Sequence, residues 1–228
     1  MKTRTQTYID RIGTSIQQMQ ELVSEAFTLS IEAFKGLDKE TALRAQEISF
    51  RVAEMADAIE EDVFQTIARR QPVARDLRAL ASYNFVALHL SRIGRYAYKV
   101  SHIVKLAQGL SHYKELISIP QMTQNAIECL NIAVKALLEG DLSNIAALEK
   151  LEAETDGETV EMFHEITEYL RKRQDITLMS MYYMIVGRYC ERAADHAFSI
   201  AERAVYVHTG KRVHLGLAYK GKFDTAPH

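Results

Sequence analysis

The chain is poor in the residues that interrupt secondary structure. Its 228 residues include only ten glycines and three prolines, Pro72, Pro120 and Pro227. So few breakers over this length predict long, uninterrupted helices.

Cysteine, net charge and long apolar runs are scarce as well. Cys129 and Cys190 form neither a disulfide framework nor a CxxC pair, which fits a reducing compartment. No apolar run reaches the roughly 18 residues of a membrane span, and the N-terminus lacks the apolar core of a signal peptide. We therefore expect a soluble, cytoplasmic protein. A formal net charge of −2 gives no basic footprint, so direct nucleic-acid binding is not expected.

Catalytic signatures are missing too. The sequence contains no HExxH, P-loop, GxGxxG or GxSxG motif.

What the chain does contain is helical periodicity. Hydrophobic residues make up 47% and charged residues 25%, ordinary proportions for a globular protein with a buried core. Apolar positions recur at helical spacings, with Gly36 and Asp38 at the first break and Gln71 and Pro72 at the second. The pattern predicts helices over residues 8–34, 39–70, 72–107, 122–138, 142–173 and 176–208.

The second three helices repeat the first three. The turn at Asp38 recurs 103 residues later at Asp141, and residues 92–97 match residues 192–197 at an offset of 100. The first offset pairs Ser49 with Glu152 and Ala53 with Asp156. Because short connections make sequential helices antiparallel neighbours, we predict an all-α protein of two tandem antiparallel three-helix bundles. The predicted divisions are a first repeat over residues 1–107, a linker over 108–120, a second repeat over 121–212 and a C-terminal tail over 213–228.

Two acidic pairs are the main chemical feature. Glu152 and Asp156 lie four residues apart on the fifth helix, and Glu191 and Asp195 do so on the sixth. Residues at this spacing share one helix face, so the pairs on neighbouring helices are candidates for a four-carboxylate metal site. Oxygen ligands of this kind suit magnesium, calcium, manganese or iron. The alternative is a solvated acidic face, which spacing alone favours.

Several segments resemble the PhoU family of phosphate-uptake regulators. Residues 69–78, RRQPVARDLR, are similar to the RQPxAxDLR segment that opens that family's third helix. Residues 191–197, ERAADHA, resemble its ERIGDHA signature, residues 91–95 occupy the first copy, and residues 206–211 look like the end of its last helix. The resemblance covers about residues 8–212.

The resemblance implies fold, role and ligands. Family members fold as two three-helix bundles with E/DxxxD motifs that bind multinuclear iron or other metal clusters. It implies a metal site at Glu152, Asp156, Glu191 and Asp195, with iron favoured and manganese, zinc or magnesium as alternatives. It also implies a regulatory adaptor that negatively controls phosphate uptake, with no catalytic residues and no enzyme activity. The expected partners are the ATPase component of a phosphate transporter or a sensor kinase, with membrane contact only through them, and a second copy in a homodimer.

The first half departs from the family pattern. Ser49, Ala53, Ser91 and Arg95 stand where acids are expected. Arg95 places a fixed positive charge there, because a guanidinium stays protonated. We therefore expect no metal in the first half.

Other features have ordinary interpretations beside functional ones. His196, next to Asp195, is expected to be half-buried and hydrogen-bonded rather than a ligand. Glu161 and His164 match the Glu-x-x-His element of di-iron bundles, a weak match because two such elements are required. An iron-handling or oxidase protein, or a metal-free scaffold, is therefore the alternative.

Basic residues gather on the third helix and at its entry, and tyrosines on the third and sixth helices. The basic residues are Arg69, Arg70, Arg75, Arg78, Arg92, Arg95 and Lys99. We expect a solvated face paired with Glu54, Asp57, Glu60, Glu61 and Asp62, the alternative being a docking face for an acidic partner or an anion. The tyrosines of the third and sixth helices are expected in the core and at interfaces.

Overall fold

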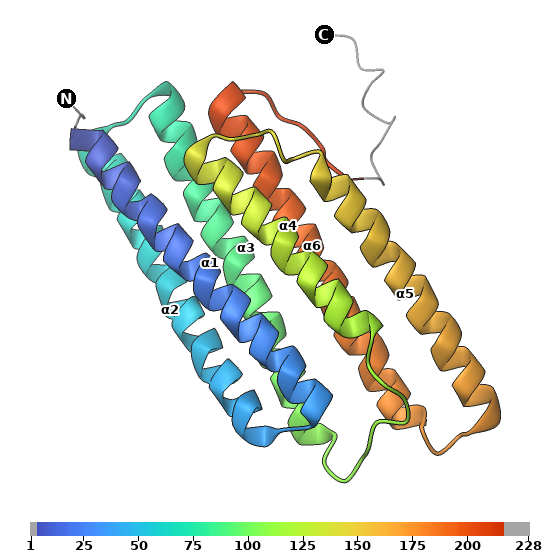
Figure 1. Ribbon diagram of the computed structural model, residues 1–228. Coiled ribbons are helices and arrows are strands. Elements are labelled where there is room, and N and C mark those ends of the chain that lie inside the picture. Colours follow the sequence, from blue (N-terminus) through green and yellow to red (C-terminus); the bar gives the residue numbers. More distant parts are fainter. Residues whose placement is uncertain (1–3, 217–228) are drawn as a thin grey trace.

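The computed structural model describes residues 4–216 of the protein. Residues 1–3 of the predicted first repeat and residues 217–228 of the predicted tail lie outside this range. The described chain forms six helices, all roughly parallel or antiparallel to one another (Figure 1). Their bounds are α1 Arg4–Gly36, α2 Lys39–Arg70, α3 Ala74–Leu106, α4 Ser118–Glu139, α5 Ala147–Lys172 and α6 Thr177–Thr209. The all-α bundle prediction is confirmed.

Helix ends follow local chemistry, with some differences from the prediction. Asp38 caps α2 as expected, because its carboxylate accepts hydrogen bonds from the backbone N–H groups of the helix's first turn. At the end of α1, however, Leu37 and not Gly36 takes the left-handed conformation, with φ at 49°. Pro72 precedes the third helix instead of lying in its first turn, since α3 begins at Ala74.

The second half shows larger differences. Helix α4 begins at Ser118, so Pro120 lies in its first turn, where a missing N–H costs nothing. Helix α5 begins at Ala147, five residues later than predicted. Asp141 accepts hydrogen bonds from the N–H and hydroxyl of Ser143 and holds the preceding segment in a turn.

The two halves meet through equivalent helices. Helix α1 contacts α4 and α3 contacts α6, while α2 and α5 lie on opposite outer sides (Figure 1). One continuous hydrophobic core runs through both halves, and Phe27, Phe34 and Tyr183 are among its largest fully buried side chains. Within residues 4–216, no helix combines the length and apolarity needed to cross a membrane.

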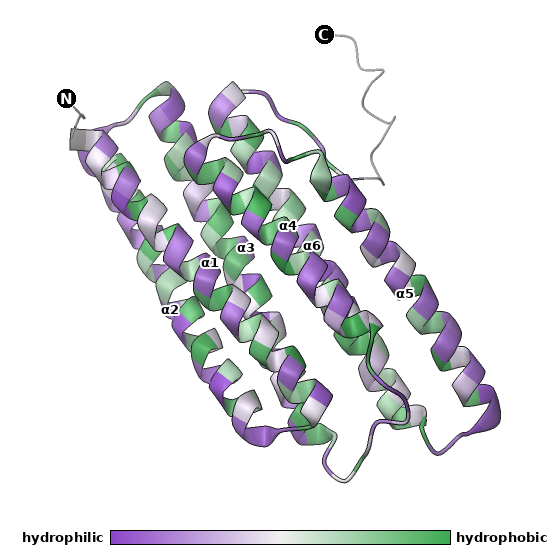
Figure 2. Ribbon diagram, in the orientation of Figure 1, coloured by the Kyte–Doolittle hydropathy of each residue, from purple (hydrophilic) through white to green (hydrophobic). Residues whose placement is uncertain are grey.

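Helix α5 is the least integrated element. It packs mainly against α4 and touches α6 less, whereas α2 packs closely on both α1 and α3. Only Leu148, Thr155, Met162 and Ile166 of α5 are buried. Hydrophilic residues dominate the visible side of this helix (Figure 2).

Candidate functional site

The acidic pairs lie on the facing sides of α5 and α6. Glu152 and Asp156 belong to α5, and between them the buried Thr155 accepts a hydrogen bond from Asn125 Nδ2 of α4 at 3.3 Å. This contact orients the acidic face of α5 relative to α4. Glu152 and Glu191 are half-buried, and the side chains of Asp156 and Asp195 remain exposed.

The carboxylates interact across the two helices. Desolvation raises the pKa of Asp156, and the Glu191 carboxylate raises it further. Desolvation likewise raises the pKa of Asp195, with Glu191 as the next cause and Asp156 as a smaller one. Glu191 is in turn paired with Arg188 Nη1 at 2.6 Å. The face therefore carries mutual repulsion that Arg188 and Arg192 partly offset.

A cavity of about 380 Å³ adjoins this face. Glu152 and Asp195 line it together with Glu202 and residues 214–216, which follow α6. The Leu215 backbone N–H donates to Glu202 Oε1 at 2.9 Å, and this bond fixes the segment over the cavity. Glu202 was not among the site residues predicted from the sequence, although its position seven residues after Asp195 places it on the same helix face.

The donor types fit a hard cation, but their arrangement is incomplete. Within residues 4–216, no three His, Cys, Asp or Glu side chains are placed to hold one metal ion together. The expected convergence of four carboxylates is therefore only partial. The loose contact between α5 and α6 accounts for this, because the two acidic pairs belong to different helices.

The equivalent positions of the first half also come together. Ser49, Ala53, Ser91 and Arg95 all line one pocket of about 200 Å³, with no carboxylate among its lining residues. Ser49 donates its hydroxyl hydrogen bond to the Gly94 carbonyl. The pocket is the structural counterpart of the acidic face and is chemically different from it.

His196 turns away from the acidic face into the interface between the halves. Its Nε2 lies 3.0 Å from the Tyr96 hydroxyl, and its Nδ1 lies 2.9 Å from His89 Nδ1. Burial lowers the pKa of His196 to about 4 and that of His89 to about 3. Both ring nitrogens of His196 are engaged, so the hydrogen-bonded role is the observed one, and the ring is buried instead of half-buried.

The di-iron alternative gains no support. Glu161 and His164 are both exposed on α5 and do not point into a bundle core. Of the tyrosines expected in the core, Tyr83, Tyr96 and Tyr183 are buried.

The predicted pairing of the basic face is wrong. Within residues 4–216, no ion pair joins the basic residues named for α3 and its entry to the acidic residues of α2. Asp62 pairs with Arg11 of α1, and Arg75 Nη2 contacts His208 Nδ1 at 3.1 Å. Arg70 donates to the Tyr8 hydroxyl at 3.1 Å. These contacts join residues far apart in the sequence, which helical spacing does not reveal.

The duplicated helices and paired sites match a known domain. The family model described as "PhoU domain" matches the chain twice, over residues 16–104 and 119–204. The chain belongs to the PhoU domain family. Each match covers one three-helix half and so contains one of the two equivalent pockets.

Relatives of the PhoU family match over nearly the full chain. The phosphate-specific transport system accessory protein PhoU homolog 1 of Thermotoga maritima is 24% identical over 203 residues, 89% of this chain and 88% of the relative. The corresponding PhoU homolog of Synechocystis is 26% identical over 204 residues, 90% of this chain and 91% of the relative.

Solved PhoU structures share the fold. The crystal structure of PhoU from Pseudomonas aeruginosa matches with a TM-score of 0.85 at 22% identity, covering 91% of this chain and all of that one. The phosphate transport system regulatory protein PhoU from Streptococcus pneumoniae matches with a TM-score of 0.83 at 23% identity, covering 93% of this chain and all of that one.

Proposed function

We propose that this PhoU-domain protein is a cytoplasmic accessory protein that restrains phosphate uptake. The observation that carries the proposal is the double match to the PhoU domain, together with full-length relatives named as accessory proteins of the phosphate-specific transport system. The elongated surfaces of two joined bundles suit protein docking. The partners proposed are the ATPase component of a phosphate transporter or a sensor kinase, with the protein as a homodimer.

A deletion strain tests this role directly. Phosphate-replete cells lacking the protein should import radiolabelled phosphate faster than the parent, and the wild-type chain supplied in trans should restore the lower rate. Uptake that stays equal in the deletion and parent strains would contradict the proposal.

The acidic face is proposed to bind a metal cation, with iron favoured by the family resemblance. Desolvation, and then repulsion between the carboxylates, raises the pKa values of Asp156 and Asp195, and a cation held by Glu152, Asp156, Glu191 and Asp195 would offset both effects. It would also bridge α5 to α6. Exposed Asp156 and Asp195 side chains and a half-buried Glu191 leave room for a small rotamer change to complete a ligand set.

The metal content of the purified protein tests this prediction. Wild-type protein purified without a chelating tag should retain iron or manganese by plasma mass spectrometry, and Glu191→Ala/Asp195→Ala should lose it. The matched control is Ser91→Ala/Arg95→Ala at the equivalent first-half positions, which should leave the metal content unchanged. Equal, negligible metal in all three proteins would contradict the prediction and show that the acidic pairs form only a solvated face.

A further inference from the structure

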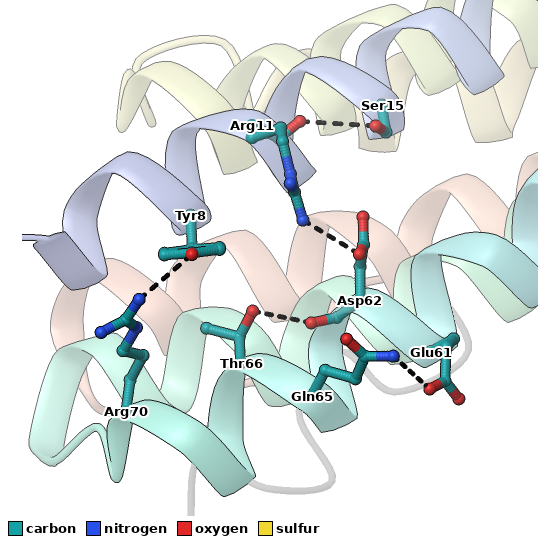
Figure 3. A network of polar contacts seen from close by, with 8 residues as sticks. All are labelled: Tyr8, Arg11, Ser15, Glu61, Asp62, Gln65, Thr66 and Arg70. Atoms are coloured by element: carbon teal, nitrogen blue, oxygen red, sulfur yellow. Dashed lines mark hydrogen bonds and ion pairs between the residues drawn. The ribbon is translucent and has the colours of Figure 1, made fainter.

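A second polar pocket lies between α1 and α2, far along the chain from the acidic pairs. Its volume is about 220 Å³, and its lining includes Arg11, Arg69, Arg70, Asp62, Tyr8 and Thr66. We call it the α1–α2 pocket. Figure 3 shows Tyr8 and Arg11 extending from α1 toward Arg70, Thr66 and Asp62 of α2.

Positive charge exceeds negative charge in this pocket. Three arginines line it against the single carboxylate of Asp62, which pairs with Arg11 at 2.9 Å. Arg69 and Arg70 have no ion-pair partner among the residues that the structure describes. Two guanidinium charges are therefore left without a carboxylate.

The positive charge of the pocket affects the pKa of the Tyr8 hydroxyl. This hydroxyl accepts a hydrogen bond from Arg70 Nη2, and the Arg70 guanidinium lies 4.8 Å from the centre of the Tyr8 ring. The hydrogen bond from Arg70 and then its charge lower the pKa of Tyr8, with smaller contributions from Arg11 and Arg69. All three arginines thus act on one hydroxyl oxygen.

We propose that the α1–α2 pocket binds a small oxyanion of the phosphate class. Guanidinium groups bind phosphate oxygens through paired N–H donors, which a single hydroxyl oxygen does not saturate. The Tyr8 hydroxyl supplies a further donor to the anion. The volume lies below the roughly 300–1,000 Å³ of pockets for drug-sized ligands, so it suits inorganic phosphate or the phosphoryl group of a small monoester.

Helix-end electrostatics account for only part of this arrangement. Arg69 and Arg70 lie in the last turn of α2, where positive side chains interact favourably with the helix dipole. That effect does not involve Arg11 or Tyr8, which belong to another helix. The convergence of both helices on one pocket is what an anion site requires.

The inference deepens the proposed function, on which its regulatory meaning rests, because phosphate bound here would report phosphate supply. Binding itself is a property of the purified chain. A wild-type chain that binds no phosphate but still controls uptake would overturn only this inference. Unchanged uptake in the deletion strain would overturn only the proposed function.

Isothermal titration of the full chain with inorganic phosphate at low salt is the test. We expect binding at one site per chain, weakened roughly tenfold or more in Arg69→Gln/Arg70→Gln because charge-assisted hydrogen bonds are lost. The matched control is Arg44→Gln/Arg51→Gln, which removes two exposed arginines from the same helix and should bind as the wild type does. Equal affinity in the pocket variant and the wild type would overturn the proposal.

A third variant guards against loss by misfolding. Asp62→Asn removes the carboxylate that competes for Arg11, so phosphate should bind several-fold more tightly, a gain that structural damage does not produce. Weaker binding by Asp62→Asn would contradict the proposal.

Parallel titrations separate the sources of the anion. Tighter binding of inorganic phosphate identifies the free ion, and tighter binding of glycerol phosphate identifies a monoester. Binding only to vesicles that contain anionic phospholipid, with neither small anion bound, would overturn the inference.

Discussion

Close packing between α2 and α3 depends on the missing side chain of Gly94. A Cβ atom at this position would lie 2.8 Å from Val52 Cγ1, closer than real Cβ contacts. The Gly94 carbonyl also accepts the Ser49 hydroxyl, so the backbone has little freedom to retreat. At this position of α3, space outweighs helix propensity.

Gly94→Ala should therefore destabilise the protein. We expect a net loss of about 1–2 kcal/mol, since overpacking costs about 1–3 kcal/mol and alanine returns up to about 1 kcal/mol of helix propensity. Urea denaturation followed by circular dichroism measures it. Gly157→Ala is the matched control, because no neighbour lies within 4 Å and a gain of about 0.5–1 kcal/mol is expected. A stabilising Gly94→Ala would disprove the steric argument.

The buried imidazole of His89 makes stability depend on pH. Burial, the neighbouring His196 and the Arg92 and Arg203 charges lower its pKa from 6.5 to about 3. Below pH 6.5 the unfolded chain takes up a proton that the folded chain refuses until about pH 3. The free energy of unfolding contributed by this group therefore falls as pH falls through that window.

His89→Gln should flatten the decline in stability between pH 6.5 and 4. For a histidine that stays neutral in the folded state, each pH unit in this range changes the free energy of unfolding by up to about 1.4 kcal/mol. Chemical denaturation at several pH values gives the slope, and His102→Gln, at an exposed position of α3, serves as the control. An unchanged slope in His89→Gln would show that His89 takes up protons in the folded state.

At the scale of whole elements, α5 differs from its equivalent α2. Few of its residues are buried, whereas α2 buries Ala45, Ile48, Val52, Ile59 and Val63 among others. Elements with few buried contacts open at lower free energy than the global unfolding reaction. The acidic face thus lies partly on the least anchored helix of the described chain.

Backbone amides of α5 should exchange with deuterium faster than those of α2. Hydrogen-exchange mass spectrometry of the two helices under native conditions provides the comparison within one sample. Within α5, the amides around Met162 should exchange more slowly than the rest of the helix, because the Met162 side chain lies against Gly187 of α6. Equal protection of α2 and α5 would indicate that α5 opens only with the whole molecule.

Helix ends were predictable where the sequence contains a capping or helix-terminating residue. Asp38 caps α2 through its own carboxylate, and Gly140 ends α4 in the left-handed conformation. Both helix ends could therefore be predicted from the sequence. The start of α5 was not, because residues 142–146 have helical periodicity but are held in a turn by Asp141. A local side-chain hydrogen bond prevailed over propensity there.

The candidate site was predictable only within each helix. Spacing identified the pair Glu191 and Asp195, since residues four apart share a face. The distance between α5 and α6 depends on how α5 packs on α4, which no single helix encodes. For the same reason the contact of Tyr8 with Arg70 was missed, because it joins residues 62 apart.

Across the whole molecule, the segment between the halves is itself an anchor. His112 Nε2 lies 2.9 Å from the Phe34 carbonyl of α1, so this nitrogen donates, and Nδ1 accepts from the Tyr183 hydroxyl of α6 at 2.8 Å. The Tyr113 hydroxyl accepts from Ser180 at 2.9 Å. The connection thus ties the end of the first helix to the last helix.

His112→Ala should loosen this tie and lower stability by about 1–3 kcal/mol, because a buried hydroxyl and a carbonyl lose their partner. The melting temperature by circular dichroism records the effect. His102→Ala removes an exposed histidine and should change it little. A loss no greater than that of the control would mean that water replaces the imidazole at both groups.

The contacts between the halves also have a twofold character. At the offset of 100 residues, Tyr96 is the counterpart of His196 and His89 the counterpart of Tyr189. His196 contacts both Tyr96 and His89, and Tyr96 in turn stacks on Tyr189. The contact between His196 and His89 is thus repeated by its counterpart, the contact between Tyr96 and Tyr189. Such repeated contacts are typical of an isologous dimer interface.

A single chain that carries such an interface has a freedom that a true homodimer lacks. In a homodimer every substitution appears twice, once on each side of the axis. Here each side mutates alone, so one pocket holds Arg95 while its counterpart holds Asp195. Joining two copies in one chain allowed the protein to keep a symmetric scaffold and still present two chemically opposite faces to its surroundings.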